Sequence, residues 1–229
     1  MTRMAMFPLG SVLFPGAVLP LHVFEPRYRQ MVRDCLANPE PEFGVALITR
    51  GSEVGGGDTR GMVATIARVV QVTQFDDGRY VLVAVGTRRV LVDSWLPDDP
   101  YPLAHVHDWP DEHRRGDERE PGEIGESFLA EPRLATVLKS TFAKVRRINA
   151  LAAEMGGGGA DLTATISDAV VLGSYQLCTL APLGPADQQR LLSAAGPSER
   201  LRMLDEALAD VEALLQFRLQ HESGNELLD

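Results

Sequence analysis

The sequence predicts an α+β protein in which residues 1–110 form a β domain, a barrel or mixed sheet with one docked helix, and residues 123–229 form a helical bundle domain. Short β-branched and aromatic runs separated by glycine and proline fill the first half, which is typical of strands and turns. Residues 111–122 have no large apolar side chain and carry both charge signs, which predicts a linker or exposed loop. Beyond them apolar residues recur with the period of an α-helix. Strands followed by helices are typical of the α+β class.

The stretch Phe7–Leu36 predicts two short strands, a turn and a helix. Its four prolines exclude a helix up to residue 25, because proline lacks an N–H group and pushes the residue before it towards extended geometry. Pro15-Gly16 fits the centre of a type II turn, where glycine supplies a positive φ. We expect a strand over residues 18–24, in which Pro20 marks an edge or a bulge. A helix should begin at Pro26 and end near residue 38. Its apolar stripe consists of Tyr28, Met31, Val32, Cys35 and Leu36.

The other strands of the β domain are expected at apolar, β-branched runs. Asp77-Gly78 predicts a hairpin with a type I′ turn, which needs a positive φ at both central residues. Gly86 is expected to separate two strands, and the glycine-rich residues 49–60 to form a surface loop. The run before the hairpin is long enough to bend around a barrel corner. These strands are predicted at residues 43–48, 62–75, 80–85, 88–92 and 103–109.

Apolar residues at helical spacing predict four helices in the second half. A long helix should begin after Glu123 and end before residue 156, and Ser167 can cap a second helix that ends at Leu180. A short third helix holds Leu191, and the last begins at residues 196–198. The apolar positions of the last helix have the spacing of a bundle or short coiled coil. They are Leu201, Leu204, Leu208, Val211 and Leu215.

Composition excludes several classes of protein. The apolar fraction of 45% is too high for a disordered chain. A net charge of −10 opposes nucleic-acid binding, which needs a clustered positive field. The sequence has no signal-peptide core and no apolar run of membrane-spanning length, so we expect a cytoplasmic protein with no membrane partner. Cys35 and Cys178 lie in apolar helical patterns and are expected to be buried free thiols.

No combination of residues predicts a catalytic site, a cofactor or a metal ion. Ser140 and Lys144 share a helix face at i and i+4, as a nucleophile and its base could, but two solvated side chains on a bundle helix are the favoured interpretation. His105 and His107 would share a strand face, yet a metal site needs at least a third ligand. His22 or His113 could supply that ligand only if the fold brought one of them there.

Several motifs occur together in the order seen in one known family. They are FPLG at residues 7–10, LFPG at 13–16, LPL at 19–21, FEPRYR at 24–29, FGVALI at 43–48, GSEVG at 51–55, DGRY at 77–80, GTRRV at 86–90 and QRLL at 189–192. With them the chain resembles the N-terminal, substrate-binding domain of Lon protease over nearly its whole length. The resemblance implies a PUA-like β domain followed by a helical domain, and binding of polypeptide in a proteolytic context.

Lon protease itself is an ATP-driven serine peptidase, so the resemblance raises the question of catalysis. A P-loop needs G-x-x-x-x-G-K-[ST], and neither Lys139 nor Lys144 follows a glycine. The Ser-Lys dyad of the Lon proteolytic domain has no counterpart in this sequence. We therefore expect a stand-alone, non-catalytic member of the family that lacks the ATPase and peptidase modules.

The resemblance implies unfolded or exposed polypeptide segments as binding partners. Apolar and arginine side chains around the first helix and the barrel loops would supply the contacts. By position and type, the candidate contact residues are Phe14, Leu19, Arg27, Arg29, Arg60 and Arg88. Phe14, beside the Pro15-Gly16 turn, is the best candidate for an exposed aromatic anchor. Most of the other aromatic residues in this region are expected in the core, namely Phe7, Phe24, Tyr28 and Phe43.

Three other functions remain open. The helical domain could make the protein an adaptor that docks a dedicated protease or chaperone, and an apolar patch on the last helix would favour this. A small molecule could bind in the groove between barrel and helix, which a cluster of titratable groups would favour. RNA binding is a third possibility, and the net charge of −10 opposes it.

Overall fold

The computed structural model describes residues 1–51, 58–112, 126–155 and 163–225, and the chain divides into two compact units, Met1–Pro110 and Asp111–Asp229. From residue 113 onward the predicted linker lies outside the described residues. Asp111, which we had placed in that linker, is buried in the second unit. Its carboxylate lies 2.6 Å from the guanidinium of Arg200, and a buried charge requires such a partner.

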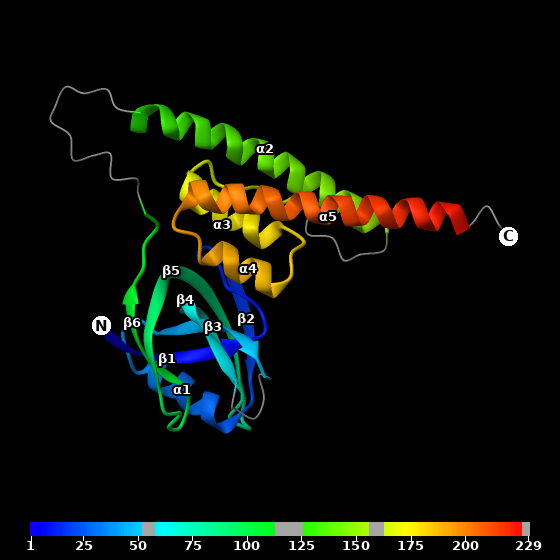
Figure 1. Ribbon diagram of the computed structural model, residues 1–229. Coiled ribbons are helices and arrows are strands. Elements are labelled where there is room, and N and C mark those ends of the chain that lie inside the picture. Colours follow the sequence, from blue (N-terminus) through cyan, green and yellow to red (C-terminus); the bar gives the residue numbers. More distant parts are fainter. Residues whose placement is uncertain (52–57, 113–125, 156–162, 226–229) are drawn as a thin grey trace. The chain divides into compact units, whose positions relative to one another are not determined.

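The first unit is built on a six-stranded sheet with the order β2-β5-β4-β3-β1-β6 (Figure 1). The second half of β5 also pairs with β6, which closes the sheet into a small barrel. β1 and β3 run parallel and the other pairs are antiparallel, so the predicted mixed sheet is confirmed. The strands are β1 (Thr2–Leu9), β2 (Val18–Val23), β3 (Glu42–Arg50), β4 (Thr59–Gln74), β5 (Tyr80–Leu96) and β6 (Leu103–Asp108).

The prediction that Gly86 separates two strands is wrong, because Gly86 lies inside the single long strand β5. The β4–β5 ladder shifts register between the pairs Ile66–Arg88 and Ala67–Gly86, which marks a β-bulge. Gly86 donates its N–H to the Ala17 carbonyl at 2.9 Å, and its own carbonyl accepts the N–H of Gly16 at 2.8 Å. The bulge therefore ties the Pro15-Gly16 turn to the sheet.

The two predicted turns differ in outcome. Gly16 has a φ of 84°, and Ala17 donates to the Phe14 carbonyl at 3.0 Å, as a type II turn requires. At the β4–β5 hairpin Gly78 has a φ of 78° but Asp77 does not have a positive φ, so the predicted type I′ turn is wrong. Gly78 donates to the Phe75 carbonyl at 2.8 Å, and Phe75 to the carbonyl of Arg79 at 2.9 Å. This is a type I turn followed by a glycine bulge, which also suits the twist of a hairpin.

Helix α1 (Pro26–Leu36) packs its predicted apolar stripe against the sheet. The rings of Tyr28 and Phe7 stack at 4.2 Å, and Phe43 lies 6.1 Å from Phe7. All three aromatic side chains are buried, which confirms them as core residues. A second cluster of smaller apolar side chains, which includes Met6 and Ile66, fills the opposite side of β1 and β4.

The second unit consists of α2 (Glu126–Glu154), α3 (Val170–Leu180), α4 (Pro185–Leu192) and α5 (Pro197–Asn225). The ion pairs Lys144–Asp205 (2.8 Å) and Arg147–Glu212 (2.8 Å) show that α2 and α5 lie side by side and run in the same direction (Figure 1). The fully buried leucines of α5 belong to the predicted spacing: Leu201, Leu204 and Leu208. Within the described residues, no helix combines the length and hydropathy needed to cross a bilayer.

Candidate functional site

The first unit has a groove of about 350 Å³ beside the β4–β5 turn. Two parts of the chain that are distant in sequence meet there: the end of β2, and the hairpin formed by the end of β4 and the start of β5. Cross-strand pairing aligns them, because His22 lies opposite Val81 and Val23 opposite Tyr80. The lining is mainly apolar and consists of His22, Val23, Phe24, Phe75, Arg79, Tyr80 and Val81.

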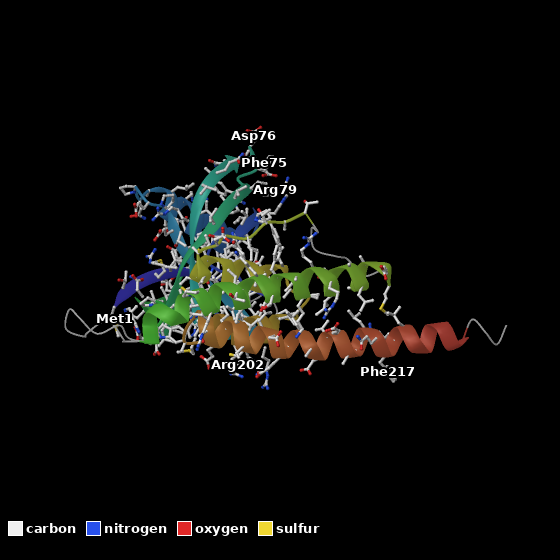
Figure 2. The ribbon with its side chains drawn as sticks, turned by 90° about the horizontal axis from the view of Figure 1, so that it is seen from above. Met1, Phe75, Asp76, Arg79, Arg202 and Phe217 are labelled. Carbon is white, nitrogen blue, oxygen red and sulfur yellow. The ribbon has the colours of Figure 1, made fainter. Side chains whose placement is uncertain are left out.

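Two exposed phenylalanines are the most prominent feature of this groove, which we call the Phe24–Phe75 groove. Phe24 stands between β2 and α1 and is 57% exposed, while Phe75 directly follows β4 and is 45% exposed. Val23 and Tyr80 beside them are almost fully buried and form part of the core. Figure 2 shows Phe75, Asp76 and Arg79 together at the tip of the hairpin. Large apolar side chains left in water at one place are typical of an interaction site.

Charged groups border the groove at the turn. The Nε atom of Arg79 lies 2.6 Å from the Asp77 carboxylate, and its guanidinium is 5.9 Å from the centre of the Phe75 ring. The backbone N–H of Arg79, followed by the guanidinium of that residue, lowers the pKa of the Asp77 carboxyl. Arg29 of α1 packs its guanidinium against Gly78, and a Cβ at this glycine would collide with it. The border therefore has donors for the carbonyl groups of a ligand beside an apolar surface.

Phe14 is not an exposed anchor, and this prediction is wrong. Its side chain is 1% exposed. The backbone of Phe14 packs closely on Gly86, where a Cβ would meet the Phe14 carbonyl oxygen, and this approach leaves the ring inside the unit. A phenylalanine beside a turn can thus point inward when the turn itself is bound to a strand.

Two of the candidate arginines are held in ion-pair networks. Arg60 lies 2.7 Å from both Asp58 and Asp98, stacks on Trp95 at 4.9 Å, and its side chain is only 9% exposed. Hydrogen bonding to Asp98 raises the pKa of this guanidinium above its usual value. Arg88 bridges Glu42 and the carboxylate of a β6 residue at 2.9 and 3.0 Å. These contacts fix both arginines within the sheet and reduce what they could offer a ligand.

The remaining candidates lie at different places. Arg27 pairs with Glu25 at 3.1 Å and covers the ring of Tyr28 at 4.6 Å. Leu19 is half-buried against the core. None of the six predicted residues lines the Phe24–Phe75 groove; Arg29 comes nearest to it, because its guanidinium packs against Gly78 of the adjoining turn.

The sequence did not indicate Phe24, Phe75 and Arg79 as groove residues. A signal for Phe75 was present, since it directly precedes the Asp76-Asp77-Gly78 turn just as Phe14 precedes its own turn. Phe24 was expected in the core, and that expectation is wrong because the residue sits at the junction between β2 and α1, where the chain leaves the sheet.

The side chains weighed as catalytic or metal-binding groups have separate partners. Ser140 donates its hydroxyl to the Val137 carbonyl at 2.9 Å, and the Lys144 ammonium lies 2.8 Å from an Asp205 carboxylate oxygen. His105 Nδ1 is 3.3 Å from the hydroxyl of Ser94, and His107 Nδ1 is 2.9 Å from Asp93. In the parts of the chain that the structure describes, no group of three histidine, cysteine or acidic side chains is arranged to hold a metal ion.

The second unit also exposes apolar side chains, on the C-terminal half of α5. Leu214 is 50% and Phe217 59% exposed. Figure 2 shows Phe217 on the side of α5 that faces away from α2, and in both views α5 extends beyond the end of α2. We call these two residues the α5 patch.

Comparisons with known proteins agree with the fold. Residues 3–210 match the family model of the ATP-dependent protease La (LON) substrate-binding domain. A crystal structure of a Lon N-terminal domain protein from Xanthomonas campestris superposes with a TM-score of 0.57 at 29% identity, covering 91% of this chain and 98% of that one. The N-terminal domain of Lon protease from the Mycobacterium avium complex superposes with a TM-score of 0.56 at 17% identity, over 91% and 99% of the two chains, and supports the fold alone.

Similar full-length proteins are much longer than this chain. Lon protease 2 of Herpetosiphon aurantiacus is 27% identical over 221 residues, which are 96% of this chain and 25% of that protein. Lon protease 2 of Sorangium cellulosum is 33% identical over 104 residues, which are 44% of this chain and 13% of that protein. The chain thus spans about a quarter or less of these relatives. The match over nearly all of its own length shows that the chain belongs to the Lon protease substrate-binding domain family.

Proposed function

We propose that this protein binds unfolded or exposed segments of other polypeptides through the Phe24–Phe75 groove, without catalysing a reaction on them. The observation that carries the proposal is the pair of half-exposed phenylalanines over a groove in a domain of the Lon substrate-binding family. The matches to Lon proteases favour polypeptide as the class of ligand, and the groove supplies an apolar surface suited to it.

Apolar burial supplies the affinity in this proposal. A side chain inserted between Phe24 and Phe75 removes apolar surface from water on both partners, at about 25 cal/mol for each Å². Ordering a flexible segment offsets much of this gain, so we expect dissociation constants that are roughly micromolar. The net charge of −10 gives acidic or nucleic-acid ligands no long-range attraction.

The test uses fluorescently labelled α-lactalbumin that has been reduced and blocked at its cysteines, so that it stays unfolded. Fluorescence anisotropy should show binding to the wild-type protein and none of native α-lactalbumin. Phe24→Ala and Phe75→Ala should each weaken binding about tenfold, which corresponds to about 1.4 kcal/mol. Phe217→Ala is a matched control, because it removes a similarly exposed phenylalanine from the other unit.

Equal affinity of the wild-type protein and the Phe24→Ala, Phe75→Ala double variant for the unfolded protein would contradict the groove as the site. Absence of binding to any unfolded polypeptide would contradict the proposed function itself.

The α5 patch favours a second candidate function, that of an adaptor. Leu214 and Phe217 lie one helical turn apart and could join the apolar face of a partner helix. A folded protease or chaperone subunit bound by this surface would lose affinity on Phe217→Ala and not on Phe75→Ala. The same pair of variants therefore separates the two functions in opposite directions.

A further inference from the structure

The second half of β4 has an open edge. β3 pairs with β4 only as far as the pair Glu42–Arg68, followed by one backbone hydrogen bond from Val69 to the Pro41 carbonyl at 2.9 Å. From Val70 to Gln74 the described residues provide β4 with a single ladder partner, β5. All the side chains in this stretch are exposed.

The register identifies which backbone groups face that edge. Phe75 and Arg79 form a hydrogen-bonded pair, because Phe75 donates to the Arg79 carbonyl at 2.9 Å. Hydrogen-bonded and non-hydrogen-bonded pairs alternate along an antiparallel ladder. The pairs Val72–Leu82 and Gln74–Tyr80 are therefore non-hydrogen-bonded, and the N–H and C=O groups of Val72 and Gln74 point away from β5.

The apolar layer of the sheet also continues uncovered to this edge. Val72 lies opposite Leu82 and so shares its face, yet Leu82 is 0% and Val72 40% exposed. Val70, at the bulge in β4, is 59% exposed. Residues 69–75 (VVQVTQF) contain no charged side chain and no proline, the residues with which proteins usually protect an open edge. The edge strand β2 has this protection in Pro20.

We propose that the β4 edge, defined as residues Val70–Gln74, takes an extended polypeptide segment as an additional strand of the sheet. An extended peptide backbone can supply hydrogen-bond partners for the outward N–H and C=O groups of Val72 and Gln74, and the peptide side chains cover Val72. The segment is uncharged and β-branched along the edge and carries a basic residue at the end beside the turn. There it faces Asp76, which is exposed and has no ion-pair partner among the described residues.

This inference rests on the proposed function and names the form in which the polypeptide binds. Phe75, which directly follows the β4 edge, also lines the Phe24–Phe75 groove. A strand added to β4 can therefore place a following side chain in the groove.

The first test replaces Gln74 with proline. Proline removes the outward N–H and is tolerated on an edge strand whose N–H faces solvent, while Gln74→Ala removes the side chain and keeps the N–H. The probe is a short synthetic peptide of alternating valine and threonine with a lysine at one end. We expect Gln74→Pro to bind this peptide at least about tenfold more weakly than Gln74→Ala. The same peptide with two interior prolines should not bind the wild-type protein.

The second test needs no variant and decides the matter if Gln74→Pro fails to fold, as judged by circular dichroism. Amide hydrogen exchange of the wild-type protein is compared with and without the peptide. The amides of Val72 and Gln74 should exchange fast in the free protein and at least about tenfold more slowly with peptide bound. Those of Gln71 and Thr73, which already bond to β5, should change little.

Two results would overturn strand addition: equal peptide affinity of Gln74→Pro and Gln74→Ala, or unchanged exchange at Val72 and Gln74 with peptide bound. If unfolded α-lactalbumin still bound in a Phe75-dependent way, the proposed function would stand and the added strand would be wrong. If neither probe bound, both would fall.

Discussion

Two cysteine thiols, Cys35 of α1 and Cys178 of α3, lie among buried apolar side chains and form no disulfide. Burial disfavours the charged thiolate and raises the pKa of Cys35 to about 11 and that of Cys178 to about 12, from an ordinary value near 9. The predicted buried free thiols are therefore confirmed, and their chemistry follows from the raised pKa values.

We predict that both thiols of the native protein resist alkylation. At about pH 8 the rise in the pKa of Cys35 from 9.0 to about 11 lowers its thiolate fraction about 100-fold, and the thiolate is the reactive form. Because the folded pKa exceeds the unfolded one, the stability that the neutral thiols contribute is present below about pH 9 and is lost as pH rises towards 11–12. Iodoacetamide labelling followed by mass spectrometry should show modification in urea but not in buffer. Rapid labelling of the native protein near pH 8 would contradict the burial of these residues.

The sequence predicted that most aromatic residues around the first helix lie in the core, but it did not predict which of them face solvent. Phe14 and Phe75 both adjoin a glycine turn, and the sequence around them is equally compatible with exposure. Their difference arises from contacts with distant residues. Phe14 lies on a turn that is bound to Gly86 of β5, whereas Phe75 ends a hairpin that projects from the sheet. Local sequence does not contain such long-range pairing.

Among the elements, β4 and β5 are the two long strands that join the parts of the barrel. β5 pairs with β2 through its first half and with β6 through its second half, and Gly86 lies at the change. A Cβ at Gly86 would meet the carbonyl oxygen of Phe14, a backbone group that cannot move aside cheaply. The glycine is therefore required by close approach rather than by a positive φ.

We predict that Gly86→Ala lowers the free energy of unfolding by about 1–3 kcal/mol, because the added methyl group separates the Pro15-Gly16 turn from β5. Gly184→Ala serves as the control, since no atom lies within 4 Å of the position its Cβ would take, and should change stability by less than about 1 kcal/mol. Urea unfolding followed by circular dichroism measures both. Equal stability of the Gly86→Ala and wild-type proteins would show that the turn can leave the strand without cost.

Elements with a strong local pattern were predictable, and those defined by their partners were not. The apolar stripe of α1 and the leucine spacing of α5 indicated the buried faces of both helices, because helical periodicity is a property of residues that are close together in sequence. The open edge of β4 depends on where β3 stops pairing, at Glu42. Strand partners are distant in sequence, so the local pattern predicted the strand but not its unpaired edge.

At the scale of the whole molecule, each unit has its own core. The two apolar clusters of the first unit consist entirely of residues before Pro110. In the second unit Arg200 is fully buried, 2.6 Å from Asp111 and 2.9 Å from both Ser174 Oγ and the Tyr175 hydroxyl. Asp111, the first residue of this unit, is thus bound to α3 through Tyr175 and to α5 through Arg200.

This arrangement predicts where the chain can be divided. Residues 1–110 produced alone should fold, show a β-type circular dichroism spectrum and keep the affinity of the whole chain for unfolded α-lactalbumin, because the Phe24–Phe75 groove lies within them. Residues 111–229 should also fold. A fragment that begins at residue 113 should be less stable by about 3–5 kcal/mol, since removing Asp111 leaves the guanidinium of Arg200 buried without its carboxylate. Urea unfolding of the two helical fragments measures that difference, and Asp111→Ala in the longer fragment should reproduce it. Equal stability of the fragments that begin at residues 111 and 113 would show that Arg200 finds another partner.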